Sequence, residues 1–270
     1  MSRQQAIFKK RKDYGMPVKL EDTTKARKLF GEWKETLIWS CLQKVMGDIY
    51  VDNASDPQSA MAVLGDFCFF AGNAEEDLVS YKPENCFQDF IIMVPQSEEW
   101  AELIVKKYGD RAKPVTRYAI KKEQNIFDKD TLRPAVNSLK PGYTLRMIDA
   151  DLFALCRSSA WCQDLVSQFE DYETYKKLGI GIAVLKGESL AAGASSYARY
   201  REGIEIQIDT KEEFRRNGLA YACGAKLILE CLNKGLYPSW DAQNQASAAL
   251  AEKLGYHFDH EYKAFEIWGY

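Results

Sequence analysis

The stretch IDTKEEFRRNGLAYACGAKLILECLNKG, residues 208–235, joins a strand end, a charged loop and a helix. Two arginines, an asparagine and a glycine occupy 215–218, directly before the helix. Unpaired N–H groups at a helix N-terminus attract anions, so this start is typical of a phosphate-binding loop. A solvated first turn with arginines placed by chance is the alternative. The helix itself carries an apolar stripe at helical spacing: Leu219, Cys223, Leu227, Ile228 and Leu232.

Strands and helices alternate on both sides of this stretch. Residues 203–210 alternate Ile204, Ile206 and Ile208 with polar residues, which predicts a half-buried strand. The segments expected around it are a strand at 143–148, a helix from about Asp149, a hairpin over 181–200, a strand at 236–242, a helix at 245–254 and final strands at 257–262 and 264–270.

The first half of the chain follows a similar order. It predicts a helix from about Thr23 to Cys41, a strand at 48–51, a hairpin over 60–72 that turns at Gly65-Asp66, a strand at 90–94, a helix at 97–109 and a strand at 117–122. Residues 123–141 contain two prolines and little periodicity, so we place a linker there and expect two domains, 1–135 and 136–270. The first half has no room for a counterpart of 208–235, so it is either a degenerate repeat or a chance match of a common order.

Composition limits the class of protein. The 270 residues have a net charge of −3 and a sequence pI near 5.7, with charges of both signs interspersed, which argues against a nucleic-acid partner. The first ten residues lack the apolar stretch of a secretory signal, and no apolar run is long enough to span a bilayer. Seven cysteines without a CxxC pair indicate reduced core thiols. We therefore expect a cytoplasmic protein with no membrane partner.

Two separated motifs resemble those of the GNAT superfamily of N-acetyltransferases. The family's pyrophosphate loop reads Gln/Arg-x-x-Gly-x-Gly/Ala, and Arg215, Gly218 and Ala220 occupy those places. The family continues with an Asn after the next strand and with Gly-Phe or Gly-Tyr eleven and twelve positions later, which matches Asn244 and Gly255-Tyr256. The resemblance covers residues 140–270. It implies an α/β (α+β) GNAT fold, a mixed and mostly antiparallel sheet with flanking helices, preceded by a degenerate GNAT-like domain.

The resemblance also implies how acetyl-CoA, the co-substrate, would bind. Its pyrophosphate would lie on the N–H groups of Arg216, Asn217, Gly218, Leu219 and Ala220, next to Arg215. Its pantetheine arm would pair with the backbone around Ile208 and Thr210, where the family's fourth and fifth strands part. Asn244 would reach the pantetheine amide, although capping the helix at 245–254 explains that residue equally well.

Acyl transfer to an amine needs a base, an oxyanion donor and a proton for the leaving thiolate. Glu205 is the candidate catalytic base and Asp209 the second choice, while a backbone N–H of residues 204–210 would hold the oxyanion. Alternation alone would instead make Glu205 part of a solvent face. Many family members place a Tyr seven positions after the Asn, where this chain has Ala251; Tyr197 and Tyr256 are possible substitutes.

These residues predict N-acetylation of a primary amine of a small molecule or peptide, with acetyl-CoA as donor, direct transfer in a ternary complex and no metal. The pair His257 and His260 has no third ligand, so a metal site is disfavoured. Two alternatives remain open. The missing Tyr allows a catalytically weak acetyl-CoA sensor or scaffold, and tandem GNAT-like domains also occur in aminoacyl-tRNA-dependent transferases, although the acidic charge argues against the latter.

Overall fold

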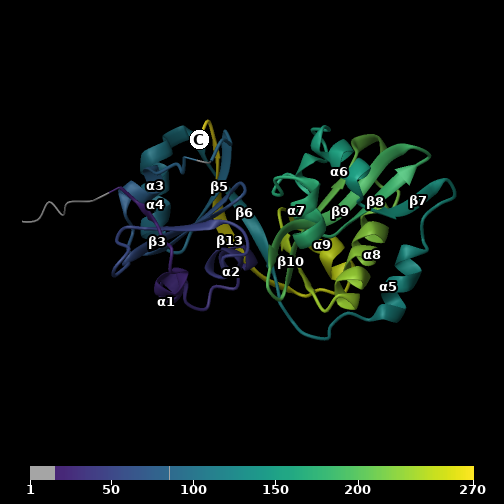
Figure 1. Ribbon diagram of the computed structural model, residues 1–270, viewed down its shortest axis with the longest axis horizontal. Coiled ribbons are helices and arrows are strands. Elements are labelled where there is room, and N and C mark those ends of the chain that lie inside the picture. Colours follow the sequence, from purple (N-terminus) through teal and green to yellow (C-terminus); the bar gives the residue numbers. More distant parts are fainter. Residues whose placement is uncertain (1–15, 85) are drawn as a thin grey trace, which may run out of the picture. The chain divides into compact units, whose positions relative to one another are not determined.

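The computed structural model describes residues 16–84 and 86–270, which form two compact units (Figure 1). Of the described residues, unit 1 contains 16–32, 48–84, 86–113 and 265–270, and unit 2 contains 33–47 and 114–264. This division differs from a single boundary near residue 135, because residues 33–47 and 114–135 belong to unit 2. The first ten residues, on which the absence of a secretory signal was predicted, lie outside the described part of the chain.

Unit 1 is built on a mixed sheet in which β1 to β5 follow one another and the end of β13 adds the next strand. The hairpin predicted at Gly65-Asp66 is confirmed, because β3 and β4 are antiparallel with Leu64 opposite Phe67. Its elements are β1 (Val18–Lys19), α1 (Arg27–Phe30), β2 (Asp48–Val51), β3 (Ser59–Leu64), β4 (Phe67–Gly72), α3 (Glu76–Ser80), β5 (Phe90–Pro95) and α4 (Glu98–Tyr108).

The segment between β4 and β5 holds only the five-residue helix α3, and β4 and β5 are parallel. A helical crossover between parallel strands is therefore present in unit 1 in a shortened form, rather than lost as the sequence had suggested. The strands pair from Phe67–Ile92 to Phe70–Pro95, and Gln96 N–H then donates to Phe70 C=O. The two strands thus stay together to the end of β5.

Unit 2 is built on a five-stranded sheet in the order β11-β10-β9-β8-β7, antiparallel except for the β10/β11 pair. The strands are β7 (Tyr143–Met147), β8 (Gly181–Lys186), β9 (Ser189–Tyr200), β10 (Gly203–Thr210) and β11 (Tyr237–Ser239), and β12 (Asp241–Ala242) pairs with β6 (Ala112–Ile120). The helices are α2 (Thr36–Leu42), α5 (Lys129–Val136), α6 (Ala150–Arg157), α7 (Tyr172–Leu178), α8 (Leu219–Asn233) and α9 (Gln245–Lys253).

Helices cover both faces of this sheet (Figure 1). On one face α8 buries its apolar stripe against Ile204 and Ile206 of β10, and α5 packs on α8 through Leu132 and Ala135. On the other face α6 and α7 pack against β8. The mixed, mostly antiparallel sheet with flanking helices is therefore confirmed.

Three segments differ from the sequence prediction. The expected linker at 123–141 contains α5, whose apolar side chains are part of the core. The expected strand at 236–242 is broken at Trp240, whose buried ring separates β11 from β12. The final two strands are one strand, β13 (Phe258–Trp268). No helix among the described residues is long and apolar enough to cross a membrane.

Gly203 sets the close approach of β10 and β11. A Cβ added at Gly203 would meet the backbone oxygen of Tyr237, which cannot move without shifting β11. We expect Gly203→Ala to lower the free energy of unfolding by about 2 kcal/mol, measured by chemical denaturation. Gly193→Ala is the comparison, because its Cβ would meet mainly the flexible end of the Leu165 side chain. Equal losses in the two variants would contradict this role for Gly203.

Candidate functional site

The strands β10 and β11 part in the middle of β10. They pair at Gly203, Ile204 and Glu205 only, after which the chain passes Trp240 and joins β6 as β12. β10 continues to Thr210 with β9 on one side and no described strand on the other. Because strand backbones alternate, and Lys211 N–H donates to Ala191 C=O of β9, the N–H and C=O groups of Ile208 and Thr210 face the free edge.

The loop after β10 leads into helix α8, and no side chain caps the N-terminus of this helix. Gly218 is the N-cap of α8 with φ 77°, a left-handed conformation that favours glycine. The first helical bond runs from Ala222 N–H to Gly218 C=O, so the N–H groups of Leu219, Ala220 and Tyr221 have no helical acceptor. A Cβ at Gly218 would meet nothing within 4 Å. The space in front of the helix start is therefore open.

Three cationic side chains surround this helix start. Arg215 and Arg216 are exposed, and Arg216 has a positive φ of 61°. The Asn217 side chain holds the loop itself, because its amide donates to the carbonyl groups of Phe214 and Arg215 at 3.2 Å. Lys140, which the sequence did not single out, donates to Asn217 Oδ1 at 3.2 Å. The loop thus presents backbone N–H groups and positive charge at the end of the free β10 edge.

Asn244 has the capping role that was its alternative explanation. Its Oδ1 accepts from Ser247 N–H at 2.9 Å and starts α9. The residue is exposed, and its amide nitrogen has no partner within the described residues. The cap leaves that nitrogen free for a second role.

Glu205 is buried, so the solvent-face explanation does not hold for it. Its side chain is 7% exposed. The Thr36 hydroxyl donates to Oε2, while Oε1 is enclosed and has no hydrogen-bond partner in residues 16–84 and 86–270. Burial raises the pKa of Glu205 to about 7, against the lowering effect of the Lys122 charge. A carboxyl with these properties can exchange a proton near neutral pH.

Asp209 is the other carboxyl on this face of β10. Burial raises its pKa to about 6, and Gln207 Nε2 donates to its Oδ2 at 3.0 Å. Gln207 lies between the two acids along the strand. Asp209 therefore has a donor already, whereas one oxygen of Glu205 has none.

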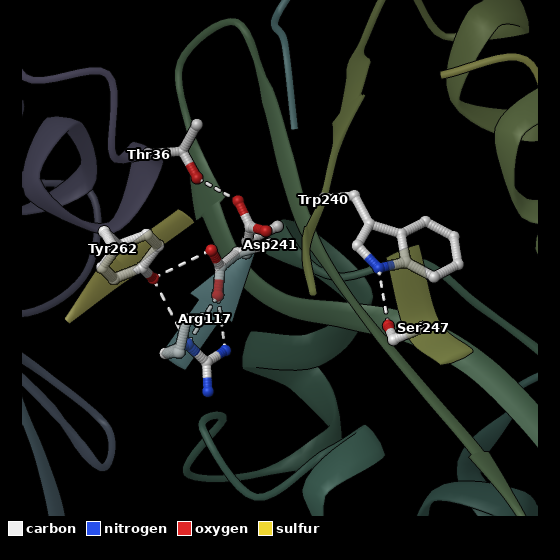
Figure 2. Close-up of polar contacts among 7 residues, drawn as sticks. Thr36, Arg117, Trp240, Asp241, Ser247 and Tyr262 are labelled. Atoms are coloured by element: carbon white, nitrogen blue, oxygen red, sulfur yellow. Dashed lines mark hydrogen bonds and ion pairs between the residues drawn. The ribbon is translucent and has the colours of Figure 1, made fainter. Parts of the chain in front are cut away.

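Further charged residues from distant parts of unit 2, among them Lys122, Asp241 and Glu35, act on Glu205. Figure 2 shows Asp241 between Arg117 and Tyr262. Asp241 accepts from Arg117 Nε at 2.8 Å and from the Tyr262 hydroxyl at 2.8 Å, so both of its oxygens are engaged. Burial opposes the charge of Lys122, but the carboxylates of Glu35 and Glu205 outweigh this effect and raise its pKa. Glu35 is itself buried, and burial raises its pKa.

The sequence analysis missed most of this cluster. Glu35, Thr36, Arg117 and Lys122 lie in segments that were expected in the first domain, and no local motif links them to β10. These residues come together because the chain first pairs with β10 as β11 and then pairs with β6 as β12, an order that local motifs do not predict.

Of the two proposed substitutes for the absent Tyr, Tyr256 has its hydroxyl already engaged. Ala251 lies on α9 and is fully buried in the core. The Tyr256 hydroxyl donates to Pro238 C=O at 2.7 Å, and Tyr197 lies at the irregularity where β9 skips a residue opposite β10. At the fork itself the hydroxyls of Tyr200 and Ser239 are bonded to each other at 2.9 Å.

The described residues hold no group of three potential metal ligands. His257 Nδ1 lies 2.7 Å from Glu123, and His260 Nδ1 lies 3.4 Å from Asp259, so the two histidines have separate partners. The helix-start feature is also confined to unit 2. In unit 1 the corresponding helix α3 has five residues and begins with Glu76 and Asp77, and β4 and β5 do not part.

Removing the Glu205 charge is expected to stabilise the fold above neutral pH. A carboxyl whose pKa is raised favours folding when protonated, so its contribution is greatest below pH 4.5 and declines as pH rises to about 7. We therefore expect Glu205→Gln to raise the free energy of unfolding at pH 8 by up to about 3 kcal/mol, and to give no gain at pH 4. Denaturation at both pH values tests this, with exposed Glu252→Gln as control. A pH-independent effect would exclude the charge as the cause.

Comparison with known proteins agrees with this geometry. A family profile described as GNAT acetyltransferase matches residues 27–265. An uncharacterized N-acetyltransferase of Bacillus subtilis, YdfB, is 29% identical over 251 residues, 85% of this chain and 89% of the relative. The crystal structure of a GCN5-related N-acetyltransferase-like protein from Streptococcus suis is 45% identical, with a TM-score of 0.86 over 92% of this chain and 98% of that one. A tandem GNAT protein from the clavulanic acid pathway, 10% identical with a TM-score of 0.53 over 94% of this chain and 98% of that one, shares the fold.

Proposed function

Because the chain belongs to the GNAT acetyltransferase family, we propose that it moves an acetyl group from acetyl-CoA to a primary amine of a small molecule or peptide. Transfer would be direct, with donor and acceptor bound together. The observation that supports this most is the meeting, at one end of β10, of a free strand edge and an uncapped helix start. The first suits an amide-containing arm and the second a pyrophosphate.

The residues present fit acetyl-CoA. The N–H groups of residues 216–220 and the charges of Arg215 and Arg216 would hold the pyrophosphate, because φ 77° and open space at Gly218 let it approach the backbone. The backbone of Ile208 and Thr210 would pair with the pantetheine arm, and the amide nitrogen of Asn244 would reach it from the other side. Bound in this way, the thioester supplies the activated acetyl group.

Glu205 is the proposed base. Its free Oε1 and its raised pKa suit it to take the proton of an ammonium acceptor, directly or through water, and Thr36 fixes the carboxyl in one orientation. A backbone N–H of the strand at 204–210 would stabilise the oxyanion. Asp209 is the second choice, because its carboxylate is already bonded to Gln207.

A catalytically weak acetyl-CoA sensor or scaffold is the second candidate, and the buried Ala251 at the position of the family's Tyr favours it. The two functions are separated by incubating the protein with acetyl-CoA and a panel of primary amines. Acetylated product and free CoA in equal amounts would support the transferase. Saturable acetyl-CoA binding without product from any amine would support the sensor. Product formed only with aminoacyl-tRNA would indicate the RNA-dependent reaction instead.

A further inference from the structure

Two carboxyl groups of unit 2 are buried without a full set of partners. Glu35 is 6% exposed, and its carboxylate makes no hydrogen bond or ion pair to a residue that the structure describes. Glu205 is 7% exposed and its Oε1 has no donor within the same residues. Buried polar atoms nearly always have partners, and an unpaired buried charge destabilises a fold strongly. Glu205 Oε1 is such an atom, enclosed and without a donor among the described residues, and in this acidic cluster it indicates that a ligand supplies what is missing.

The cations of the cluster leave one negative charge uncompensated. Arg117 is held by Asp241 and Tyr262, which form a neutral group with it. Lys122 interacts with Glu35 and Glu205 together, and no hydrogen bond commits its ammonium group to either of them in the described structure. When both carboxyl groups are ionised, two carboxylates against one ammonium leave a single negative charge. One further ammonium group would make the cluster neutral.

The chain places Glu35 well for this role. Glu35 is the N-cap of α2. Its backbone C=O accepts from Trp39 N–H, and its side chain makes no capping bond to the helix. The next residue, Thr36, donates its hydroxyl to Glu205. Two consecutive residues at the start of α2 thus act together. Glu35 supplies a carboxylate, and Thr36 orients the carboxylate of Glu205.

We propose that Glu35 and Glu205 form a subsite for the ammonium group of the acceptor, and that Glu35 makes the enzyme select amines with no carboxylate on the carbon that bears the nitrogen. The proposal rests on the transferase function proposed above. An α-carboxylate would lie beside two like charges, while both cations of the cluster already interact with carboxylates. The acceptor class is therefore a primary amine such as an alkylamine or an amino-acid amide, and not a free α-amino acid. Glu35 is a specificity-determining residue, and Glu205 remains the base.

Thermal unfolding with matched probes tests the subsite without catalysis. The probes are butylammonium chloride, norvaline amide hydrochloride and norvaline, each at pH 7 and equal ionic strength. We expect the first two to raise Tm in a saturable way and norvaline to leave it unchanged. Glu35→Gln should weaken apparent binding of the two cationic probes roughly tenfold or more, and Glu35→Asp should weaken it less. The exposed variant Glu252→Gln should behave as the unchanged protein does.

Three outcomes would overturn the proposal. They are no saturable rise in Tm with either cationic probe, a rise with norvaline equal to that with its amide, and a rise that persists in Glu35→Gln. Acetyl-CoA takes no part in this experiment, so its result is independent of the donor titration that tests the transferase function. Where an accepted amine is found, Glu35→Gln should raise its KM about tenfold and change kcat little, because Glu205 is still present.

Discussion

Gly218→Glu is expected to lower the affinity for acetyl-CoA about 100-fold or more, since it replaces favourable helix-terminus and N–H interactions by repulsion. The new carboxylate would lie in front of the N–H groups of Leu219, Ala220 and Tyr221, where the pyrophosphate is proposed to bind. An acidic side chain at a helix N-terminus interacts favourably with the helix dipole, which partly offsets the strain of a non-glycine residue at φ 77°. The variant should therefore fold. Calorimetric titration with acetyl-CoA measures the change.

The same helix provides a matched control for this variant. Gly235 follows the C-terminal end of α8 with φ 68°, and a Cβ there would also meet nothing within 4 Å. Gly235→Glu imposes a similar backbone strain and the same charge at the opposite end of the helix, so it should bind acetyl-CoA normally. Equal loss in the two variants would indicate a general effect on α8. Normal binding by Gly218→Glu would remove residues 216–220 from the donor site.

Glu205→Gln is expected to lower kcat by roughly 10²- to 10⁴-fold, the usual contribution of a general base. The affinity for acetyl-CoA should not change, because Glu205 lies on the opposite face of β10 from Ile204 and Ile206 and away from the pyrophosphate loop. Glutamine has the size and shape of glutamate, and its carbonyl oxygen can still accept the bond from the Thr36 hydroxyl. Its amide cannot take a proton. Steady-state kinetics with an accepted amine, combined with donor titration, separates the two effects.

The direction in which kcat changes with pH is an independent test of Glu205 as the base. A base must be ionised, so activity should rise with pH and level off above the pKa of about 7. Lys122 lowers that pKa, whereas Asp241 and Glu35 raise it, so Lys122→Met should move the rise to higher pH. Asp209→Asn serves as the competing variant. If it loses the activity and Glu205→Gln does not, Asp209 is the base.

Local patterns were sufficient to predict the main elements of the donor side. The alternation over 203–210 and the apolar stripe of the following helix each describe one element packed on one core, so sequence spacing and three-dimensional position agree. The position of the fork was only implied by family resemblance. Its physical marker, Trp240 between two short strands, had looked like part of a single continuous strand.

The proposed acceptor side depends on contacts between residues far apart in the chain. Thr36 and Glu205 are 169 positions apart, and Arg117 and Asp241 are 124 apart. No periodicity within a segment reports such a pair. The alternation over 203–210 favours a solvent-facing Glu205. In the structure Glu205 is buried, because α2 covers that part of β10.

The interleaved order of the units has a consequence for how such a protein can change by recombination. Any single crossover between residues 48 and 113 separates Glu35 and Thr36 from the strand that carries Glu205. A chimera that takes its second half from a relative would thus combine the residues of the proposed ammonium subsite from two parents. Shuffling of homologous halves should therefore alter the choice of amine while the donor loop, contained within residues 208–235, passes intact from one parent.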